Sequence, residues 1–362
     1  FRFCCIQHLN NNIFCYVIHI YQIARKYVLR NCLLVRKFLF IVFFMKKNLV
    51  FIDGSAGTTG LQVSSRLSQR SDIRLISLAE TDRKSEEKRA SAMQEADVAI
   101  LCLPDSAAMQ AAAMVAGMDV RIIDASSAHR TADGWVYGFP ELRPDQSQKI
   151  AEANLVSNPG CYASGFIALS HPLIENGLIA PDQTLITPAV SGYSGGGKNM
   201  IASMKKGILP PHFDYSLGLS HKHIPEMMKH SGLRVAPLFM PSVGMFEQGM
   251  LVRLAIPAAD FSKNVTIHDI HEIYQEAYHY HPMIRVCGLD EASSLQHSGQ
   301  LSADGVAGQD GLEIFCFNNP ETQQFLIIAR LDNLGKGAAG AAVQNLNIML
   351  GCSPNTGLNW DY

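Results

Sequence analysis

A single cysteine in a chain-breaking context is the strongest candidate nucleophile in this 362-residue sequence. Cys161 follows the Asn-Pro-Gly segment 158–160 and precedes the apolar run 166–169, so we expect it to begin a helix. The helix dipole and the free backbone N–H groups there favour thiolate over thiol. Cys161 could therefore attack a carbonyl carbon at neutral pH. By composition alone, a lone cysteine is more often a small buried hydrophobe, and Cys102 fits that alternative.

Two histidines are candidates for the proton shuttle that a thiolate nucleophile needs. His221 and His223 lie two positions apart, and Glu226 follows three positions after His223. The carboxylate could orient an imidazole and raise its basicity. A metal pair and plain surface polarity are the alternatives. Zinc requires further ligands at matching spacing and this segment offers none, so we predict no metal site.

A glycine-rich turn is the candidate dinucleotide site. It follows an apolar strand at 49–52 and precedes a predicted helix at 61–67. Missing side chains there let a pyrophosphate approach backbone N–H groups and the positive end of the helix. The spacing is a variant of the usual GxGxxG, and a tight structural turn is the alternative. The candidate contacts are Gly54, Ser55, Gly57, Thr58, Thr59 and Gly60.

The loop after the second predicted strand bears on the choice between NAD and NADP. Glu80 at the strand end would favour the bare ribose of NAD, whereas Arg83 and Lys84 could hold the extra phosphate of NADP. Because two cations lie in this loop, we predict NADP. The alternative is a solvated run of charges.

The order of apolar segments predicts the fold. Continuous apolar runs at 73–78, 98–103 and 120–123 alternate with helical stretches, which indicates a parallel sheet covered on both faces. We therefore predict a doubly wound α/β domain over 45–158. Alternating segments such as 249–256 indicate antiparallel strands, so we predict a second, α+β catalytic domain over 159–329. A helix within 330–352 is expected to pack back on the first domain.

Composition and charge exclude several classes of protein. The formal net charge is −2, which offers no basic field for a nucleic-acid backbone. Residues 1–44 carry six of the 30 basic side chains and no acidic one, so 24 basic and 32 acidic side chains remain in 45–362. The longest clean apolar run in that leader, 38–45, is far shorter than the ~20 residues that span a bilayer. We expect residues 1–44 to be upstream sequence or an uncleaved leader outside the fold, and no membrane partner; a membrane or transit segment is the alternative.

The nine cysteines are odd in number, widely scattered and without a CxxC pair. This pattern is not a disulfide framework or a zinc knuckle. It predicts a protein of the reducing cytoplasm, with one thiol that could be reactive.

Several segments occur in the order seen in N-acetyl-γ-glutamyl-phosphate reductases, and the sequence resembles the shorter form of that family. The resemblance covers 45–350 and none of 1–44. The contexts of Cys161 and His223 distinguish this family from the related aspartate-semialdehyde dehydrogenases. One departure is the run Gly-Gly-Gly-Lys at 195–198, where the family pattern has Gly-Ala-Gly-Arg and a guanidinium fork. The matching segments are 54–60, 124–130, 137–142, 158–162, 191–198, 221–226 and 332–340.

The resemblance implies a reaction and roles for particular residues. N-acetyl-γ-glutamyl phosphate would be reduced by NADPH to N-acetylglutamate 5-semialdehyde and phosphate, a step of arginine biosynthesis, through a thioester on Cys161. His223 would carry protons and Glu226 would orient it. Asn333 and Gly335 would contact the nicotinamide end of the cofactor. The candidate substrate contacts are Ser127, Arg130, Ser194, Lys198 and His221.

The resemblance also implies self-association into a dimer or tetramer, with the second domain serving dimerisation as well as catalysis. Two alternatives to this function stay open. The same chemistry could act on aspartate semialdehyde or on a sugar-phosphate aldehyde. A dinucleotide-sensing module could keep the fold without catalysis.

Overall fold

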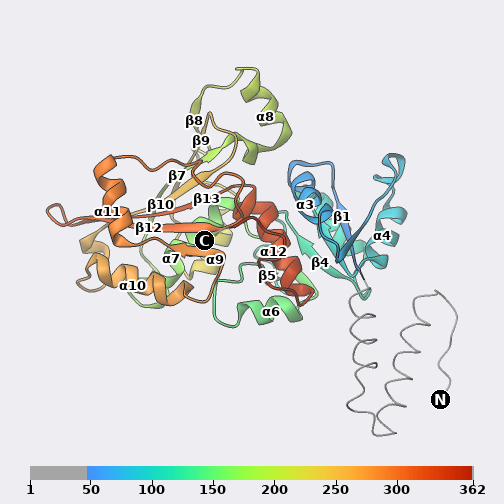
Figure 1. Cartoon of the computed structure of the whole chain (residues 1–362), viewed down its shortest axis with the longest axis horizontal. Coiled ribbons are helices and arrows are strands. Elements are labelled where there is room, and N and C mark those ends of the chain that lie inside the picture. Colours follow the sequence, from blue (N-terminus) through green and yellow to red (C-terminus); the bar gives the residue numbers. More distant parts are fainter. Residues whose placement is uncertain (1–46, 361–362) are drawn as a thin grey trace, which may run out of the picture. The chain divides into compact units, whose positions relative to one another are not determined.

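The computed structural model describes residues 47–360, apart from the side chains of 296–298 (Figure 1). The predicted leader at 1–44 lies outside the described residues. Residues 49–70 and 75–360 form one compact unit. None of the helices in the described part of the chain combines the length and the apolar character that crossing a bilayer requires.

The first sheet is the predicted doubly wound one. Its strand order is β2-β1-β3-β4-β6-β5, and the pairs from β1 onward are parallel. Every residue of β3 is buried, because helices cover both faces of the sheet. The strands are Asn48–Asp53 (β1), Ile73–Ile76 (β2), Val98–Leu101 (β3), Arg121–Asp124 (β4), Val136–Tyr137 (β5) and Leu155–Ser157 (β6).

Helices connect these strands as the alternating pattern predicts. A short 3-10 turn, η1, lies between β2 and α4. A buried apolar cluster that includes Phe51, Met93, Leu101 and Ile122 joins the sheet to its helices. The helices are Thr58–Ser68 (α3), Glu86–Glu95 (α4), Asp105–Met114 (α5) and Gln146–Glu152 (α6), and η1 is Glu80–Asp82.

The second sheet has the strand order β11-β12-β13-β10-β7-β9-β8. The sequence predicts antiparallel strands here, and the central pairs β10–β13, β10–β7 and β12–β13 are antiparallel. The pairs β7–β9 and β11–β12 are parallel, because a long connection precedes β9 and β12 in each case. The strands are Ile186–Gly192 (β7), His212–Asp214 (β8), Leu238–Gly244 (β9), Met250–Pro257 (β10), Ile284–Val286 (β11), Leu312–Asn319 (β12) and Gln324–Leu331 (β13).

The helices α7 and α10 share the large apolar core with one face of the second sheet. Phe166 on α7 and Tyr274 on α10 are fully buried there, beside Val252 of β10 and Ile327 of β13. The helices of this part are Cys161–Glu175 (α7), Gly197–Lys205 (α8), Ile224–Ser231 (α9), Ile267–Tyr278 (α10) and Leu289–Ser298 (α11), with the 3-10 turns Tyr193–Gly196 (η2) and Ala258–Asp260 (η3).

The chain returns to the first sheet after β13. A π-helix, η4 (Gly335–Ala339), leads directly into α12 (Gly340–Met349). Helix α12, drawn in red in Figure 1, contacts α3, α6 and β4, and all of its residues are buried. Asn345 on α12 donates a hydrogen bond to the carbonyl oxygen of Gly138 at 2.9 Å.

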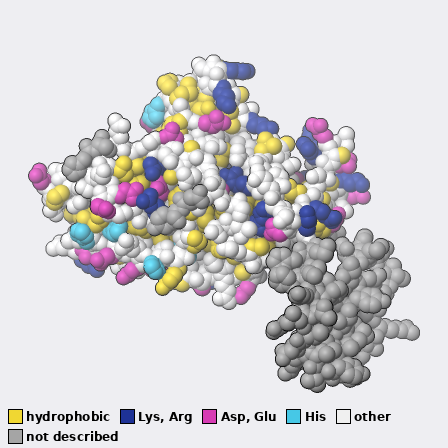
Figure 2. Space-filling model, in the orientation of Figure 1, with side chains coloured by type: hydrophobic (Ala, Val, Ile, Leu, Met, Phe, Trp, Pro, Cys, Tyr) yellow, Lys and Arg dark blue, Asp and Glu magenta, His cyan; other side chains and the backbone are white. Residues whose placement is uncertain are grey.

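On the face shown in Figure 2, Lys and Arg side chains lie scattered among Asp and Glu side chains and do not gather into one large basic patch.

Candidate active site

Cys161 is the first residue of α7, as the segment 158–160 predicts. Gly160 is the N-cap residue, with extended backbone angles. The connection from β6 into α7 is fixed by Asn158, whose backbone N–H donates to the Asp124 carbonyl oxygen at 2.8 Å. Cys161 therefore lies at the carboxyl edge of the first sheet, where ligands bind in folds of this kind. Its side chain is half-buried against the core of the second sheet.

The protonation state of Cys161 differs from the one that its helix position predicts. Burial raises the pKa of the thiol to about 11, although the Arg130 charge and the Tyr162 amide oppose that rise. In the free protein, desolvation of the sulfur opposes the thiolate that the helix start predicts. The thiol must therefore lose its proton during attack.

Alkylation of Cys161 by iodoacetamide tests this protonation state. We expect its rate to keep rising with pH well beyond the ~8.5 of an ordinary cysteine, towards the apparent pKa of about 11. Mass spectrometry of the labelled peptide measures the rate, and the Cys161→Ser variant gives the background from other thiols. A plateau reached at or below neutral pH would show a thiolate instead.

His223 is an imidazole base close to the start of α7. It is the N-cap residue of α9 and is 5% exposed. Burial, together with the charges of Arg130 and Lys222 and the ring of His221, holds the pKa of His223 well below its ordinary value. Its buried Nδ1 has no hydrogen-bond partner in the described part of the chain. The ring is therefore a neutral imidazole that can accept a proton.

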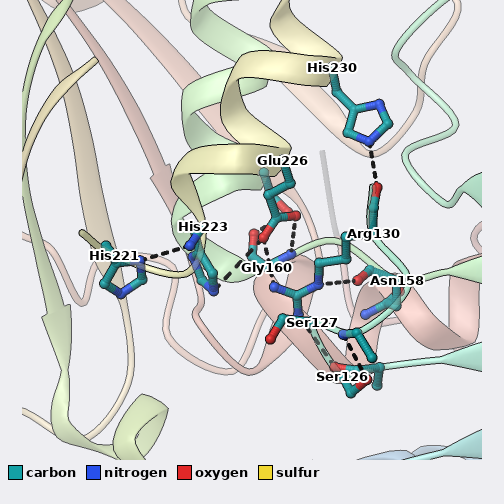
Figure 3. Close-up of polar contacts among 12 residues, drawn as sticks. Ser126, Ser127, Arg130, Asn158, Gly160, His221, His223, Glu226 and His230 are labelled. Atoms are coloured by element: carbon teal, nitrogen blue, oxygen red, sulfur yellow. Dashed lines mark hydrogen bonds and ion pairs between the residues drawn. The ribbon is translucent and has the colours of Figure 1, made fainter. Parts of the chain in front are cut away.

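Gly160 lies where several candidate catalytic groups meet. A Cβ atom at this position would lie 2.5 Å from His223 Nε2, 2.4 Å from Arg130 Nη1 and 2.6 Å from Glu226 Oε1. Real Cβ atoms do not approach other atoms so closely, so glycine is required next to Cys161. The sequence predicts Cys161, His223 and Glu226 as one group. Figure 3 shows His223 and Glu226 beside Gly160, and Cys161 is the next residue of the chain.

Glu226 lies closer to three other partners than it lies to His223. Its carboxylate accepts hydrogen bonds from Arg130 Nη1 at 2.7 Å, from the Tyr137 hydroxyl at 2.8 Å and from the Gly160 N–H at 3.1 Å. The distance from Glu226 Oε1 to His223 Nε2 is 4.0 Å. Glu226 therefore joins three separate segments around the nucleophile, in addition to the predicted contact with the imidazole.

Arg130, a predicted substrate contact, is buried and donates hydrogen bonds to acceptors of the protein itself. Its Nε donates to the Asn158 carbonyl oxygen at 2.9 Å, and its Nη1 forms the ion pair with Glu226. The guanidinium thus fixes the loop before Cys161. Any substrate anion at this position would share the arginine with Glu226.

Ser127 is a weak candidate for an anion contact. Its hydroxyl donates to Asp105 Oδ2 at 2.6 Å and its backbone N–H donates to Asp105 Oδ1 at 2.9 Å. Although burial raises the pKa of Asp105, these hydrogen bonds bring it below its ordinary value, so the carboxyl group is ionised. A neighbouring carboxylate repels a second anion.

Ser194 and Asn333 meet, although they are distant in sequence. Asn333 Nδ2 donates to Ser194 Oγ at 2.9 Å, and Asn333 Oδ1 accepts from the Gly249 N–H at 2.9 Å. Ser194 lies in η2, and Lys198 is exposed in the first turn of α8. Gly335 is buried, and a Cβ atom there would lie 2.0 Å from the Gln309 carbonyl oxygen. The predicted substrate loop and the predicted nicotinamide contact therefore share a hydrogen bond.

His221 forms a hydrogen bond with the backbone of His223. Its Nδ1 accepts a hydrogen bond from the His223 N–H at 3.1 Å, and its Nε2 lies 3.3 Å from the Tyr215 hydroxyl. Sequence reasoning missed Tyr215 and also missed His230, which stacks on Tyr137 with ring centroids 3.6 Å apart. Tyr137 begins a segment that carried the family resemblance, which was the one available signal for it.

Acid is expected to destabilise the fold through two half-buried histidines, His221 and His230. Burial lowers the pKa of His221 and of His230 to about 4. Between about 4 and the ordinary value of 6.5, the unfolded state binds protons that the folded state does not, so the free energy of unfolding falls with decreasing pH. Urea denaturation at several pH values measures this slope. We expect His230→Gln to flatten it by up to ~1.4 kcal/mol per pH unit, and identical slopes for variant and wild type would contradict the assignment.

The glycine turn after β1 fits the pyrophosphate of a dinucleotide. Gly54 has φ +84°, and a Cβ atom there would lie 2.3 Å from the Cys102 carbonyl oxygen. A Cβ atom at Gly60 would lie 2.3 Å from the Gly54 carbonyl oxygen. Gly57 is the N-cap residue of α3, with no side-chain cap and no acidic residue in the first turn. The first N–H groups of α3, at Thr58 and the residues after it, are thus left for an anion.

The predicted contacts for the extra phosphate of NADP lie beyond β2. Arg83 and Lys84 are both exposed, directly after η1 and before the N-cap residue Ser85 of α4. Cys102, at the neighbouring strand end, has a pKa raised to about 12 by burial and by Asp124 and Asp53, as suits an unreactive thiol.

Comparisons with known proteins identify the fold and the family. Residues 49–150 match the model of the semialdehyde dehydrogenase NAD binding domain, and residues 161–333 match that of the semialdehyde dehydrogenase dimerisation domain. Aspartate semialdehyde dehydrogenase II from Vibrio cholerae has a similar fold, with a TM-score of 0.65 at 15% identity over 84% of this chain and 99% of that one. The enzyme from Candida albicans with NADP has a TM-score of 0.57 at 15% identity over 86% and 99%.

Curated relatives share far more of the sequence. An N-acetyl-gamma-glutamyl-phosphate reductase from Trichormus variabilis is 48% identical over 322 residues, which are 87% of this chain and 100% of the relative. The reductase of the same name from Brucella ovis is 44% identical over 308 residues, or 83% and 98%. Identity at this level over nearly the whole of both relatives shows the family. The chain therefore belongs to the N-acetyl-gamma-glutamyl-phosphate reductase family.

Proposed function

We propose that this protein reduces N-acetyl-γ-glutamyl phosphate to N-acetylglutamate 5-semialdehyde with NADPH and releases phosphate, a step of arginine biosynthesis. The observation that carries the proposal is the position of Cys161 at the start of α7 with neutral His223 across Gly160. A thiol and a base in this arrangement suit acyl transfer. The names of the relatives supply the substrate.

The cofactor site is proposed from the glycine turn and the loop after β2. Gly54, Gly57 and Gly60 would leave room for the pyrophosphate, and the α3 N–H groups would bind it. Arg83 and Lys84 would bind the extra phosphate of NADPH. When bound, NADPH supplies the hydride. A comparison of NADP and NAD at equal concentration tests this choice, and equal efficiency would reject the role of the two cations.

Acylation would begin when Cys161 Sγ attacks the carbonyl carbon of the acyl phosphate while His223 takes the thiol proton. A C–S bond forms, the bond from carbon to the phosphate oxygen breaks, and phosphate leaves. Glu226 and Arg130 would keep the loop before Cys161 rigid during this step. The developing oxyanion needs a preorganised donor, for which we propose the Cys161 backbone N–H at the start of α7.

Release of the aldehyde would reverse the proton transfer. Reduction of the thioester would leave a tetrahedral oxyanion on Cys161. Its C=O bond re-forms as the C–S bond breaks, which gives N-acetylglutamate 5-semialdehyde. The departing sulfur takes back the proton that His223 holds. Ser194, Lys198 and His221 are proposed substrate contacts, since η2 and His221 belong to segments that adjoin Asn333 and His223.

The reverse reaction tests the function directly. Purified protein is expected to reduce NADP when it receives both phosphate and N-acetylglutamate 5-semialdehyde, and to depend on phosphate for turnover. Aspartate semialdehyde and a sugar-phosphate aldehyde, tested side by side at equal phosphate, address the alternative substrates. A faster reaction with either of them would reject the proposed substrate, and binding of NADP without turnover of any aldehyde would favour a sensing module.

Domain organisation is also proposed. Residues 45–158 with 330–352 would bind NADP, and residues 159–329 would bind and position the substrate. We further propose a homo-oligomer, either a dimer or a tetramer, supported by the match of 161–333 to a dimerisation domain. The strand register places Leu326, Ile186 and Leu238 in one row across the second sheet, and each is exposed. Light scattering of the purified protein measures the assembly.

A cytoplasmic location is proposed from the cysteines. The five cysteines of the described residues are free thiols, and those in strands and helices are at least half-buried. Fractionation of cells that express the native gene tests the location.

A further inference from the structure

A buried ion pair lies behind the proposed site and takes no part in the steps above. Lys336 Nζ contacts both Glu141 carboxylate oxygens, at 2.7 and 2.8 Å, and Gln344 Oε1 at 2.5 Å. Both charged side chains are 1% exposed. Gln344 also donates to Glu141 Oε1 at 2.8 Å, and the ring of Phe139 lies 5.2 Å from the ammonium group. Every oxygen and nitrogen of the pair is thus engaged by protein.

Stability alone does not account for such a pair. Removing two charges from water is costly, and apolar residues of similar volume often stabilise a fold as well or better. A fully hydrogen-bonded charge pair does specify one arrangement of the segments that it joins. Here those segments are the loop that follows β5, which bears Glu141, and the π-helix η4, which bears Lys336.

The π-helix η4 forms one wall behind the nucleophile. A Cβ atom at Gly337 would lie 2.7 Å from Cys161 Cβ, so the backbone next to Lys336 directly abuts the nucleophile. The Ala338 carbonyl oxygen accepts a hydrogen bond from Asn158 Nδ2 at 2.9 Å. The two residues that follow Lys336 therefore contact the loop that carries Cys161. Turns of π-helix are rare and are frequent at functional sites.

The other end of η4 leads to the proposed nicotinamide contact. Asn333 is three positions before Lys336 and is held by Ser194 and Gly249. Asp332 accepts a hydrogen bond from the Leu334 N–H at 2.7 Å. Lys336 thus sits between the loop that would meet the hydride donor and the backbone that meets Cys161.

We propose that Lys336 and Glu141 are positioning residues that fix η4 between Cys161 and the loop of Asn333, so that the thioester carbon and the hydride donor meet in one geometry. The proposal rests on the proposed function. The proposal distinguishes two steps of the reaction. Hydride transfer needs η4 in this position, whereas acylation depends on the contacts of Gly160, His223 and Glu226.

A single-turnover burst isolates the hydride step. Without phosphate, NADP and N-acetylglutamate 5-semialdehyde can produce at most one NADPH per Cys161. The acyl group then stays on the cysteine as a thioester, because no phosphate is present to accept it. We expect Glu141→Gln and Lys336→Met to slow this burst by ~10–100-fold, since small misplacements of reacting groups cost that much. Deuterium at the aldehyde carbon should then slow the burst further. Partial misfolding alone would lower the amplitude of the burst and leave its rate unchanged.

A measurement without cofactor and a matched control complete the test. In the cofactor-free protein, a loosened η4 should expose Cys161 and raise its alkylation rate several-fold in both variants. Glu313 is the matched control: it is a buried glutamate that pairs with Arg330 at 2.6 Å on the second sheet. Glu313→Gln should lower thermal stability without changing the burst rate or the alkylation rate.

The double variant Lys336→Met/Glu141→Met distinguishes a role in positioning η4 from the mere cost of leaving one buried charge unpaired. We expect its thermal midpoint to recover towards that of the wild type while its burst stays slow. An unchanged burst rate in both single variants, or full recovery of the burst in the double variant, would overturn the proposal. A wild-type protein that gives no burst with this aldehyde would instead reject the proposed function, so the two failures are distinct.

Discussion

Replacing Cys161 by serine is expected to lower kcat of the phosphate-dependent reduction of NADP by at least ~10⁴-fold. A hydroxyl group is much harder to ionise than a thiol. His223 is a weak base in its buried site, because its pKa is held well below the ordinary value. The base could therefore not activate the serine oxygen. Initial rates with N-acetylglutamate 5-semialdehyde, phosphate and NADP measure the effect.

Two controls distinguish loss of the nucleophile from loss of structure. NADP binding, followed by fluorescence quenching, should be the same in the variant and in the wild type. Cys352→Ser removes another half-buried thiol, which lies after α12 and outside the proposed site, and should keep wild-type activity. A Cys161→Ser protein that retains more than ~1% of activity would show that the thioester is not on the pathway.

Replacing His223 by glutamine is expected to lower kcat by ~10²–10⁴-fold, with KM for the aldehyde little changed. The variant keeps a polar side chain but cannot take the thiol proton, which Cys161 holds firmly because burial raises its pKa. In the wild type, the depressed pKa of His223 keeps the imidazole neutral below its ordinary value of 6.5. The profile of kcat/KM against pH should therefore show no loss of activity as the pH falls through 6.5.

An exposed histidine supplies the matched control for this second variant. His268 lies in the first turn of α10, and His268→Gln should be as active as the wild type. Activity of His223→Gln within tenfold of the wild type would assign the proton transfer to another group. A wild-type profile that declines around 6.5 would show that the pKa of the imidazole is not depressed.

Sequence patterns predicted the features that depend on neighbouring residues. Pro159 and Gly160 end one element and begin another, so the place of Cys161 at the start of α7 followed from residues next to it. The glycine turn was predictable for the same reason: Gly54 and Gly60 are needed because their backbones approach others too closely for a side chain. The continuous apolar strands predicted the first sheet, because an unbroken apolar run within a single strand already indicates that both of its faces are buried.

Contacts between distant residues were decided by the tertiary structure. Arg130 and Glu226 are 96 positions apart, and Lys336 and Glu141 are 195 apart, so no local pattern could pair them. The family resemblance therefore implied a substrate contact for Arg130, and no pattern in the sequence pointed to Lys336. The two parallel pairs in the second sheet also depend on how long connections fold back, which alternation along one strand does not specify.

Protonation states were also decided by the tertiary structure. The sequence placed Cys161 at a helix start and so predicted a thiolate, but the surrounding core removes water from the sulfur and raises its pKa. Desolvation depends on everything packed around a group, from every part of the chain, whereas the helix dipole depends on one segment. For this protein the sequence by itself determined which side chains are candidates for the chemistry and where their elements begin. Only packing decided the charge that those side chains carry and the partners that hold them, because burial and long-range contacts exist in the folded chain alone.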